Sequence, residues 1–515
     1  MTSAKPNVVT TKSGKLEGDF QDGVYIFKGI PYAAPPVGDL RWMPPQPVKP
    51  WPGVKQAKQF GSVAAQTWPT TGPLAAFREV EPQSEDCLFL NIWTPGLDNK
   101  KRPVMFWIHG GGFAFGSGSS VSYNTGNLAK RGDIVQVTIN YRLAELGFLR
   151  LKDATGGKIP ATGNEGLMDQ MAALKWVRDN IAAFGGDPGN VTVFGESAGG
   201  MSIGCLLAMP AAKGLFHKAI CESGVGSTSV SLASANAVGE SFLKLLNLKS
   251  NDVAAIRALT VEQILAADTP LKIAMTRPGE APRITVTAPV IDGENIPDVT
   301  NKVAAKGSAR GIPVLIGTNR DEQKLFAMGQ PGLARMDEAA LAVRLGTIMS
   351  AENVPGVIEA YRKALVKRGV KPSPQELLSA IHTDAMFRMP SIGLVEAQRD
   401  NNTPAYNYVF DWVSPVMGGI LGACHALEIG FVFGTYNAVF CGSGPEAEKL
   451  SKCMQDAWLA FARTGNPGCE SIGKWPEYGK KRMTMILGKN CHVEEAPFED
   501  ERRAWEKIKR LEAMP

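Results

Sequence analysis

Long hydrophobic runs are missing from this sequence of 515 residues. No stretch approaches the roughly 18 uninterrupted apolar residues that mark a membrane-spanning helix. The first seven residues lack the apolar core of a signal peptide, and no repeat or low-complexity segment follows. The sequence therefore predicts a protein that neither spans a membrane nor is exported.

Cysteine is scarce and scattered. The eight cysteines, at positions 87, 205, 221, 424, 441, 453, 469 and 491, have neither the close regular spacing of a disulfide framework nor that of a zinc site. Several lie in apolar runs, where a small buried side chain is their usual role. A reducing compartment fits best, so we expect a cytoplasmic protein without a structural metal.

An excess of charge of either sign is also absent. The 55 basic and 50 acidic residues give a formal net charge of +5, and the basic ones are scattered, which argues against a nucleic acid partner. The composition, 44% hydrophobic and 20% charged, is typical of a large globular core. Because large sheet enzymes grow by insertion, we expect a single domain over residues 1–515. Nothing in the sequence indicates an oligomeric state.

Short apolar runs alternate with helical patterns along most of the chain. Apolar spacing predicts a crossover helix over 167–181 and another helix over 450–461. Two segments, about 228–310 and 330–400, are interpreted as helical insertions over the active site. The fold class is therefore α/β, with a large, mostly parallel central sheet flanked by helices. The runs that predict its buried strands are 104–108, 134–139, 191–194, 218–221, 313–316 and 406–410.

The main chemical signal is a G-x-S-x-G motif at 195–199, centred on Ser197. A lone match is weak, because chance supplies roughly a third of a match in a chain of this composition. A second match, centred on Ser202, indeed follows five residues later. A nucleophile elbow needs a strand before it and a helix after it. The run 191–194 leads directly into the first motif, whereas Ser202 would already lie inside the helix, so we favour Ser197.

Three consecutive glycines, at 110–112, follow the predicted strand 104–108. Residues without a Cβ let backbone N–H groups approach a developing oxyanion. We expect Gly111, Gly112 and Ala198, the residue after the nucleophile, to supply these donors.

The base should be one of five histidines. His425 follows the last strong strand, as the chain order nucleophile, acid, histidine requires. His109 belongs to the glycine run, and His217 precedes an apolar strand. We expect His382 and His492 to have no catalytic role.

The acid should follow a strand between the serine and the histidine. Asp321 and Glu322 both do so, directly after the run 313–316, and their positions alone do not separate them. Asp292 is a third candidate, although the capping of a turn accounts for it.

These motifs resemble the type-B carboxylesterase and cholinesterase family, and the similarity runs almost from end to end. The resemblance implies the α/β-hydrolase fold, Glu322 as the acid, and Ser223 in a supporting hydrogen-bond network. Gln323 replaces a glycine that is usual in the family, which makes the local turn unusual. The other segments that match are 27–33, 35–38, 40–41, 84–91, 140–143, 147–148, 163–164, 169–170, 176–177, 184–188 and 191–200.

Two departures from the family pattern concern its disulfides. The partner that the family places near 61–68 for Cys87 is absent, and 243–257, where a second disulfide is expected, has no cysteine. Both losses agree with a protein that is not secreted. Phe77 lies near the place of the aromatic site that cholinesterases use for quaternary ammonium, and we do not expect choline esters as substrates.

The sequence therefore predicts a serine carboxylesterase that hydrolyses small-molecule esters through an acyl-enzyme on Ser197, without a cofactor. A histidine base of ordinary pKa, about 6.5, predicts activity that rises from mildly acidic to neutral pH. Three alternatives remain: a hydrolase of amides, carbamates or thioesters, a lipase that acts on aggregated lipid, and a catalytically silent adhesion module. The last is disfavoured because Ser197, Glu322 and His425 are all present.

Overall fold

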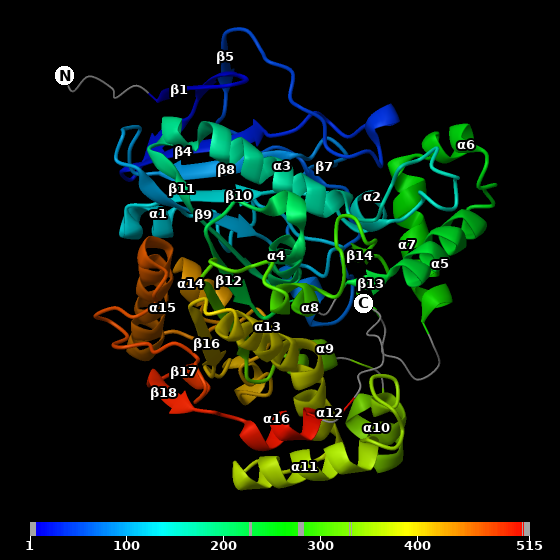
Figure 1. Ribbon diagram of the computed structural model, residues 1–515, viewed down its shortest axis with the longest axis vertical. Helices are drawn as coiled ribbons and strands as arrows, with labels where there is room; N and C mark the ends of the chain where they lie inside the picture. Colours follow the sequence, from blue (N-terminus) through cyan, green and yellow to red (C-terminus); the bar gives the residue numbers. More distant parts are fainter. Residues whose placement is uncertain are drawn as a thin grey trace.

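A computed structural model describes residues 7–225, 229–276, 283–328, 330, 332–506 and 508. A central sheet of 11 strands runs through the molecule, with helices on both faces (Figure 1). In spatial order its strands are β18 (His492–Glu495), β17 (Met483–Leu487), β16 (Ala405–Phe410), β15 (Val314–Asn319), β12 (Lys218–Glu222), β11 (Gly186–Glu196), β9 (Arg102–Ile108), β10 (Val135–Ile139), β8 (Phe89–Thr94), β4 (Val24–Pro31) and β3 (Asp19–Gln21).

The middle of the sheet is parallel, and its edges are antiparallel. Neighbouring strands from β17 to β10 pair in parallel, whereas β18, β8, β4 and β3 join in antiparallel pairs. The central strands are buried on both faces, which explains their unbroken apolar sequences. All six predicted strands are present, and the mostly parallel sheet is confirmed.

Helices pack on both faces of the sheet and enclose two separate cores. One face carries α3 (Glu165–Asn180), α4 (Ala198–Ala208), α8 (Thr300–Ala305) and α13 (Met389–Asp400). The other carries α1 (Asn127–Gly132), α14 (Ile429–Phe433) and α15 (Pro445–Thr464). The predicted helices at 167–181 and 450–461 correspond to α3 and α15. No described helix is long and apolar enough to cross a membrane.

Both predicted insertions are mainly helical where they are described. The first contains α5 (Leu232–Leu245), α6 (Val253–Arg257) and α7 (Val261–Met275), which pack beside α2 (Ala144–Phe148) at one side of the sheet (Figure 1). The second contains α10 (Glu338–Leu345), α11 (Val354–Lys367) and α12 (Pro374–Thr383). These helices gather near α9 (Gln323–Ala327) and the C-terminal α16 (Glu499–Trp505).

Short strands complete the fold away from the central sheet. They are β1 (Val8–Thr11), β2 (Gly14–Glu17) and β5 (Val54–Gln56) in one sheet, β6 (Val63–Ala64) paired with β7 (Gln83–Ser84), and β13 (Val230–Ser231) paired with β14 (Val290–Ile291).

Candidate active site

Ser197 occupies the sharp turn between β11 and α4, as the motif predicts. Its backbone has φ +55° and ψ −124°, a conformation that costs a residue with a side chain about 1–3 kcal/mol. The amide of Ser197 donates to the carbonyl oxygen of Glu222 at 2.9 Å, which ties the turn to the end of β12. The serine side chain lines a pocket above this edge of the sheet.

The glycine that follows this turn is required by close backbone contact. A Cβ on Gly199 would lie 1.9 Å from the carbonyl oxygen of Ile108 at the end of β9. Contacts under 3.0 Å essentially never occur for real Cβ atoms. Any side chain at this position would therefore push α4 away from the sheet.

A buried carboxylate holds His425. The Nδ1 atom of the imidazole lies 2.7 Å from Oε2 of Glu322. The other carboxylate oxygen accepts the amide hydrogen of Asn319 at 2.7 Å. The rings of Phe326 and Phe387 flank the imidazole, with centroids 4.9 and 5.0 Å away. These contacts fix the orientation of the ring, so that Nε2 faces the end of β11.

The geometry distinguishes the three carboxylates that the sequence offers as candidates for the acid. Asp321 forms an ion pair with Arg320 at 2.9 Å and accepts a backbone amide hydrogen. Asp292 caps a turn by accepting three successive backbone amide hydrogens. Of the three carboxylates, Glu322 is the one that contacts His425.

Glu196 faces the second nitrogen of the same imidazole. Its Oε1 lies 3.1 Å from Nε2 of His425, and both Glu196 and Ser197 line the pocket. Burial lowers the pKa of His425, but Glu196 and Glu322 outweigh it and raise this pKa to about 9. Burial also raises the pKa of Glu196, so the two groups compete for a proton. The pKa of His425 therefore differs from the ordinary value expected from the sequence, and its imidazole becomes neutral at higher pH.

Ser223 belongs to a buried polar network below Glu322. Its hydroxyl donates to Oε1 of Glu428 at 3.1 Å. The other oxygen of Glu428 accepts from the side-chain amide of Asn319 at 2.5 Å. Burial and the charge of Glu322 raise the pKa of Glu428 to about 7. Glu428 was not predicted, and its only signal in the sequence is a position three residues after His425.

The expected oxyanion donors lie around Ser197. Ala198 is the first residue of α4, so its amide has no acceptor within the helix. Gly111 has φ +103°, and a Cβ there would lie 2.0 Å from the carbonyl oxygen of Phe115. Gly111 and Gly112 line the same pocket as the serine. Among the described residues, no backbone hydrogen bond uses these three amides, so they can bind a substrate oxygen.

The pocket has a volume of about 390 Å³ and contains both Ser197 and His425. Most of its wall comes from 68–81, 107–123 and 425–441. The first insertion contributes Ile284, and the second reaches the site through Phe387 behind the histidine. The insertions therefore cover less of the site than the sequence indicated. The aromatic side chains of the wall are Trp68, Phe77, Trp107, Phe115, Tyr123, Phe326 and Phe440.

The remaining candidates of the sequence lie outside the pocket. Ser202 is buried inside α4 and accepts a hydrogen bond from the side chain of Gln170 at 3.0 Å. Nδ1 of His217 accepts a backbone amide hydrogen. His382 lies in α12, and His492 is exposed on β18.

The turn at Gln323 is regular. Gln323 starts α9 with the right-handed backbone of a helix, and its amide donates to Oγ1 of Thr383 at 3.2 Å. No positive φ is needed there, which explains why the usual glycine can be replaced.

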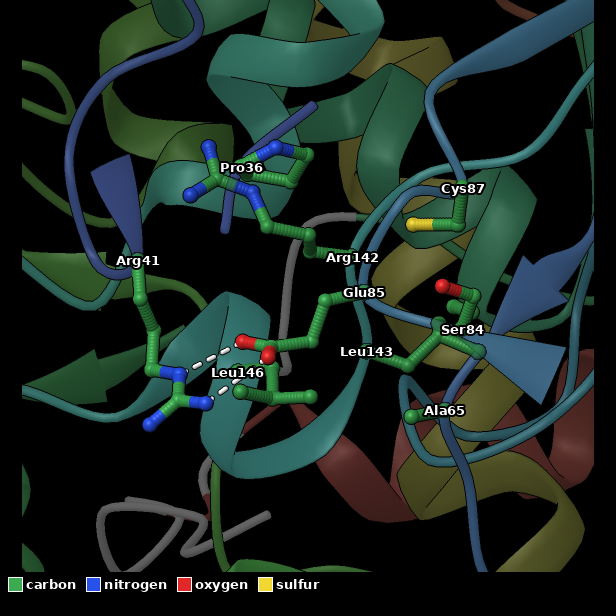
Figure 2. A pocket seen from close by; sticks show the side chains of 10 residues that line it. Pro36, Arg41, Ala65, Ser84, Glu85, Cys87, Arg142, Leu143 and Leu146 are labelled. Atoms are coloured by element: carbon green, nitrogen blue, oxygen red, sulfur yellow. Dashed lines mark hydrogen bonds and ion pairs between the residues drawn. The ribbon is translucent and has the colours of Figure 1, made fainter. Parts of the chain in front are cut away.

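A second, much smaller cavity is lined in part by Cys87 (Figure 2). Ala64 and Ala65 line it together with the ion pair of Arg41 and Glu85, whose closest atoms are 2.5 Å apart. Its volume of about 10 Å³ suffices for one water molecule. Cys87 is a free, buried thiol, which agrees with the missing partner in the sequence.

Comparison with known proteins relates this geometry to enzymes. A sequence model of the Carboxylesterase family matches residues 5–505. Para-nitrobenzyl esterase of Bacillus subtilis (strain 168) is 40% identical over 96% of this chain and 98% of that protein. Carboxylesterase 1D of Rattus norvegicus is 33% identical over 99% of this chain and 94% of that protein. A crystal structure of a Geobacillus stearothermophilus carboxylesterase superimposes with a TM-score of 0.85 at 38% identity, covering 97% of this chain and 100% of that one.

Proposed function

Because this chain belongs to the carboxylesterase family, we propose that Ser197 is its nucleophile, His425 its general base and Glu322 the carboxylate that orients the base. The protein is a serine hydrolase of carboxylic esters with the α/β-hydrolase fold. One observation supports the assignment of residues: a strained serine, a buried histidine–carboxylate pair and the glycines 111 and 112 lie at one pocket, and no backbone hydrogen bond within the described part of the chain uses the amides of Gly111, Gly112 or Ala198.

The reaction follows from these positions. Neutral His425 accepts the proton of the Ser197 hydroxyl while the oxygen attacks the ester carbonyl. The amides of Gly111, Gly112 and Ala198 bind the oxyanion of the tetrahedral intermediate. The imidazolium then protonates the leaving alcohol, and an acyl-enzyme remains. Water activated by the same histidine releases the acid.

In the structure, Nε2 of His425 lies 3.1 Å from Oε1 of Glu196. Hydrogen bonds of catalytic groups are often long before substrate binds and tighten in the complex. We therefore expect a hydrogen bond between the Ser197 hydroxyl and Nε2 of His425 to form when an ester enters the pocket.

The test is hydrolysis of p-nitrophenyl esters by Ser197→Ala, with Ser202→Ala as matched control. We expect the first variant to lose activity by about 10⁶-fold, and the second to keep most of it. Treatment with an organophosphate followed by peptide mapping should place the label on Ser197. A fully active Ser197→Ala enzyme, or a label on Ser202, would refute the assignment.

A lipase that acts on aggregated esters is a second candidate, because exposed apolar side chains lie at or next to residues that line the pocket. Val80, Val121 and Val439 are 91, 68 and 79% exposed. Their neighbours in the chain, Glu79 and Phe440, line the pocket. Rates measured across the critical micelle concentration of a long-chain ester distinguish the two functions. A sharp rise above this concentration supports the lipase, and simple saturation supports the esterase.

Two finer predictions complete the proposal. The same groups could hydrolyse amides, carbamates or thioesters, and substrates with matched leaving groups would measure this preference. We also propose that the enzyme acts in the cytoplasm, in keeping with its eight free thiols. Fractionation of cells that express the native gene would test the location.

A further inference from the structure

Asn319, the last residue of β15, contacts the two segments that carry the proposed acid and base. Its backbone amide donates to Oε1 of Glu322 at 2.7 Å. Its side-chain amide donates to the carbonyl oxygen of Cys424 at 2.7 Å and to Oε2 of Glu428 at 2.5 Å. Cys424 directly precedes His425, and Glu428 follows it by three residues. One amide group therefore holds the chain on both sides of the histidine.

The acceptors around this side chain fix its orientation. The carbonyl oxygen of Cys424 can only accept a hydrogen bond, so the NH₂ group of Asn319 must face it. The side-chain oxygen of Asn319 is consequently buried, and it has no hydrogen-bond partner in the described part of the chain. An unpaired buried polar atom lowers stability. Proteins keep such groups mainly where they serve a functional site, so the value of this amide lies in the contacts that it makes beside His425.

A second contact between the same two segments lies further from the histidine. The backbone amide of Asp321 donates to the carbonyl oxygen of Ala423, and the carboxylate of Asp321 accepts the amide hydrogen of Ala423, each at 2.9 Å. These bonds act two residues before His425. Asn319 instead holds the peptide group that joins residues 424 and 425, so it bears directly on the position of the imidazole.

We propose that Asn319 is a positioning residue for ester hydrolysis, because its side chain holds Nδ1 of His425 at hydrogen-bond distance from Glu322. This inference rests on the proposed function of these two residues. Removal of the side chain leaves the backbone bond to Glu322 in place but releases the peptide before His425. A misplacement of about 1 Å can lower a catalytic rate by about 100-fold. Asn319 is not part of the pocket wall, so substrate binding should change little.

The test compares Asn319→Ala with Asn407→Ala. Asn407 is also a buried asparagine of the central sheet, and its side-chain amide donates to the carbonyl oxygen of Ile316 in β15 at 2.9 Å. We expect Asn319→Ala to lower kcat for p-nitrophenyl acetate by about 10- to 100-fold, and Asn407→Ala to keep kcat within twofold. Because the same histidine serves acylation and deacylation, both steps slow together, and KM should stay within twofold. Rates measured from pH 6 to 10 separate a shift in the pKa of His425 from a lower plateau.

Proton NMR gives a readout that a loss of stability alone does not change. The proton shared between Nδ1 of His425 and Glu322 should resonate far downfield of the amide protons. We expect this signal in the wild type and in Asn407→Ala, and we expect it to be shifted or lost in Asn319→Ala. Thermal melts establish that both variants are folded. Asn319→Leu keeps the volume of the side chain and removes its donors, and it replaces the alanine variant if that variant does not fold.

The outcomes distinguish this inference from the proposed function. A kcat of Asn319→Ala within twofold of the wild type, or an unchanged downfield signal, would overturn the inference. An equal loss of kcat in Asn407→Ala would also overturn it. Glu322→Gln is measured in parallel. If that variant is fully active, the proposed acid itself is wrong, whereas an impaired Glu322→Gln beside a fully active Asn319→Ala contradicts the role of Asn319 alone.

Discussion

The substitution Glu196→Gln removes a carboxyl group beside His425, the proposed base, while it preserves the size of the side chain. The carboxylate lies 3.1 Å from Nε2 of His425. Together with Glu322, and against the effect of burial, it raises the pKa of the histidine to about 9. A histidine must be neutral to accept a proton from the nucleophile. We therefore expect the acid side of the pH profile to move to lower pH in this variant.

The magnitude of this change can be worked out. The rise in the pKa of His425 from the ordinary value of 6.5 to about 9 corresponds to roughly 3 kcal/mol. A charge pair at about 4 Å is worth roughly 4 kcal/mol at an effective dielectric constant of about 20. Because Glu322 remains, we expect the midpoint to fall by about 1–2 pH units. Neutral histidine at pH 7 would then increase from about 1% to between about 10 and 50%.

The assay is kcat/KM for p-nitrophenyl acetate between pH 6 and 10, corrected for spontaneous hydrolysis. Glu222→Gln is the matched control, because Glu222 is equally buried at the position of β12 that pairs with Glu196. Its midpoint should stay within about 0.3 of the wild-type value. A Glu196→Gln midpoint equal to that of the wild type would show that the carboxyl group carries a proton and exerts no charge on His425. A wild-type midpoint near 6.5 would contradict the same reasoning.

Three further substitutions test other parts of the structure. Glu322→Gln should lower kcat by about 10²- to 10⁴-fold, whereas Asp321→Asn should change it less than about fivefold; equal losses in initial rate would contradict the choice of acid. Gly199→Ala should abolish activity and lower Tm, because the added methyl group has no space, and a thermal melt monitored by circular dichroism would detect a stable exception. Arg142→Met should lower the free energy of unfolding by about 3–5 kcal/mol in urea, since it leaves Asp169 buried without its ion-pair partner at 2.7 Å; a loss under about 1 kcal/mol would show that the carboxyl group is neutral.

The central sheet could be predicted because its strands carry a local signal. Successive side chains of 104–108 enter two different cores, so the whole run is apolar. The wall of the pocket at 68–81 has no such pattern. The position of this wall depends on contacts between residues that are far apart in the sequence. One example is the ring contact of Phe77 with Phe440, whose centroids are 5.0 Å apart. Contacts of this kind leave no periodicity in the sequence.

The residues of the site also fall into two groups: those with a local signal in the sequence and those whose contacts depend on the fold. Ser197 could be assigned because the strand and helix beside it are local features. Asp321 and Glu322 are adjacent and chemically alike. They are distinguished by the contact of Glu322 with His425, which lies 103 residues later in the sequence. Glu196 occupies a variable position of the serine motif, so its contact with the imidazole required coordinates.

The buried carboxyl groups around the base follow from the register of the sheet. Glu196 and Glu222 end neighbouring strands at paired positions, while Glu322 and Glu428 come from segments after the next strands. In the proposed transition state His425 becomes an imidazolium, and negative charge on Glu322 and Glu196 beside it lowers the barrier. The same charge favours the imidazolium before reaction, which reduces the active fraction at neutral pH. Both effects share one cause, so Glu196→Gln should raise activity at pH 7 and lower the plateau above pH 9, and the two pH profiles should cross.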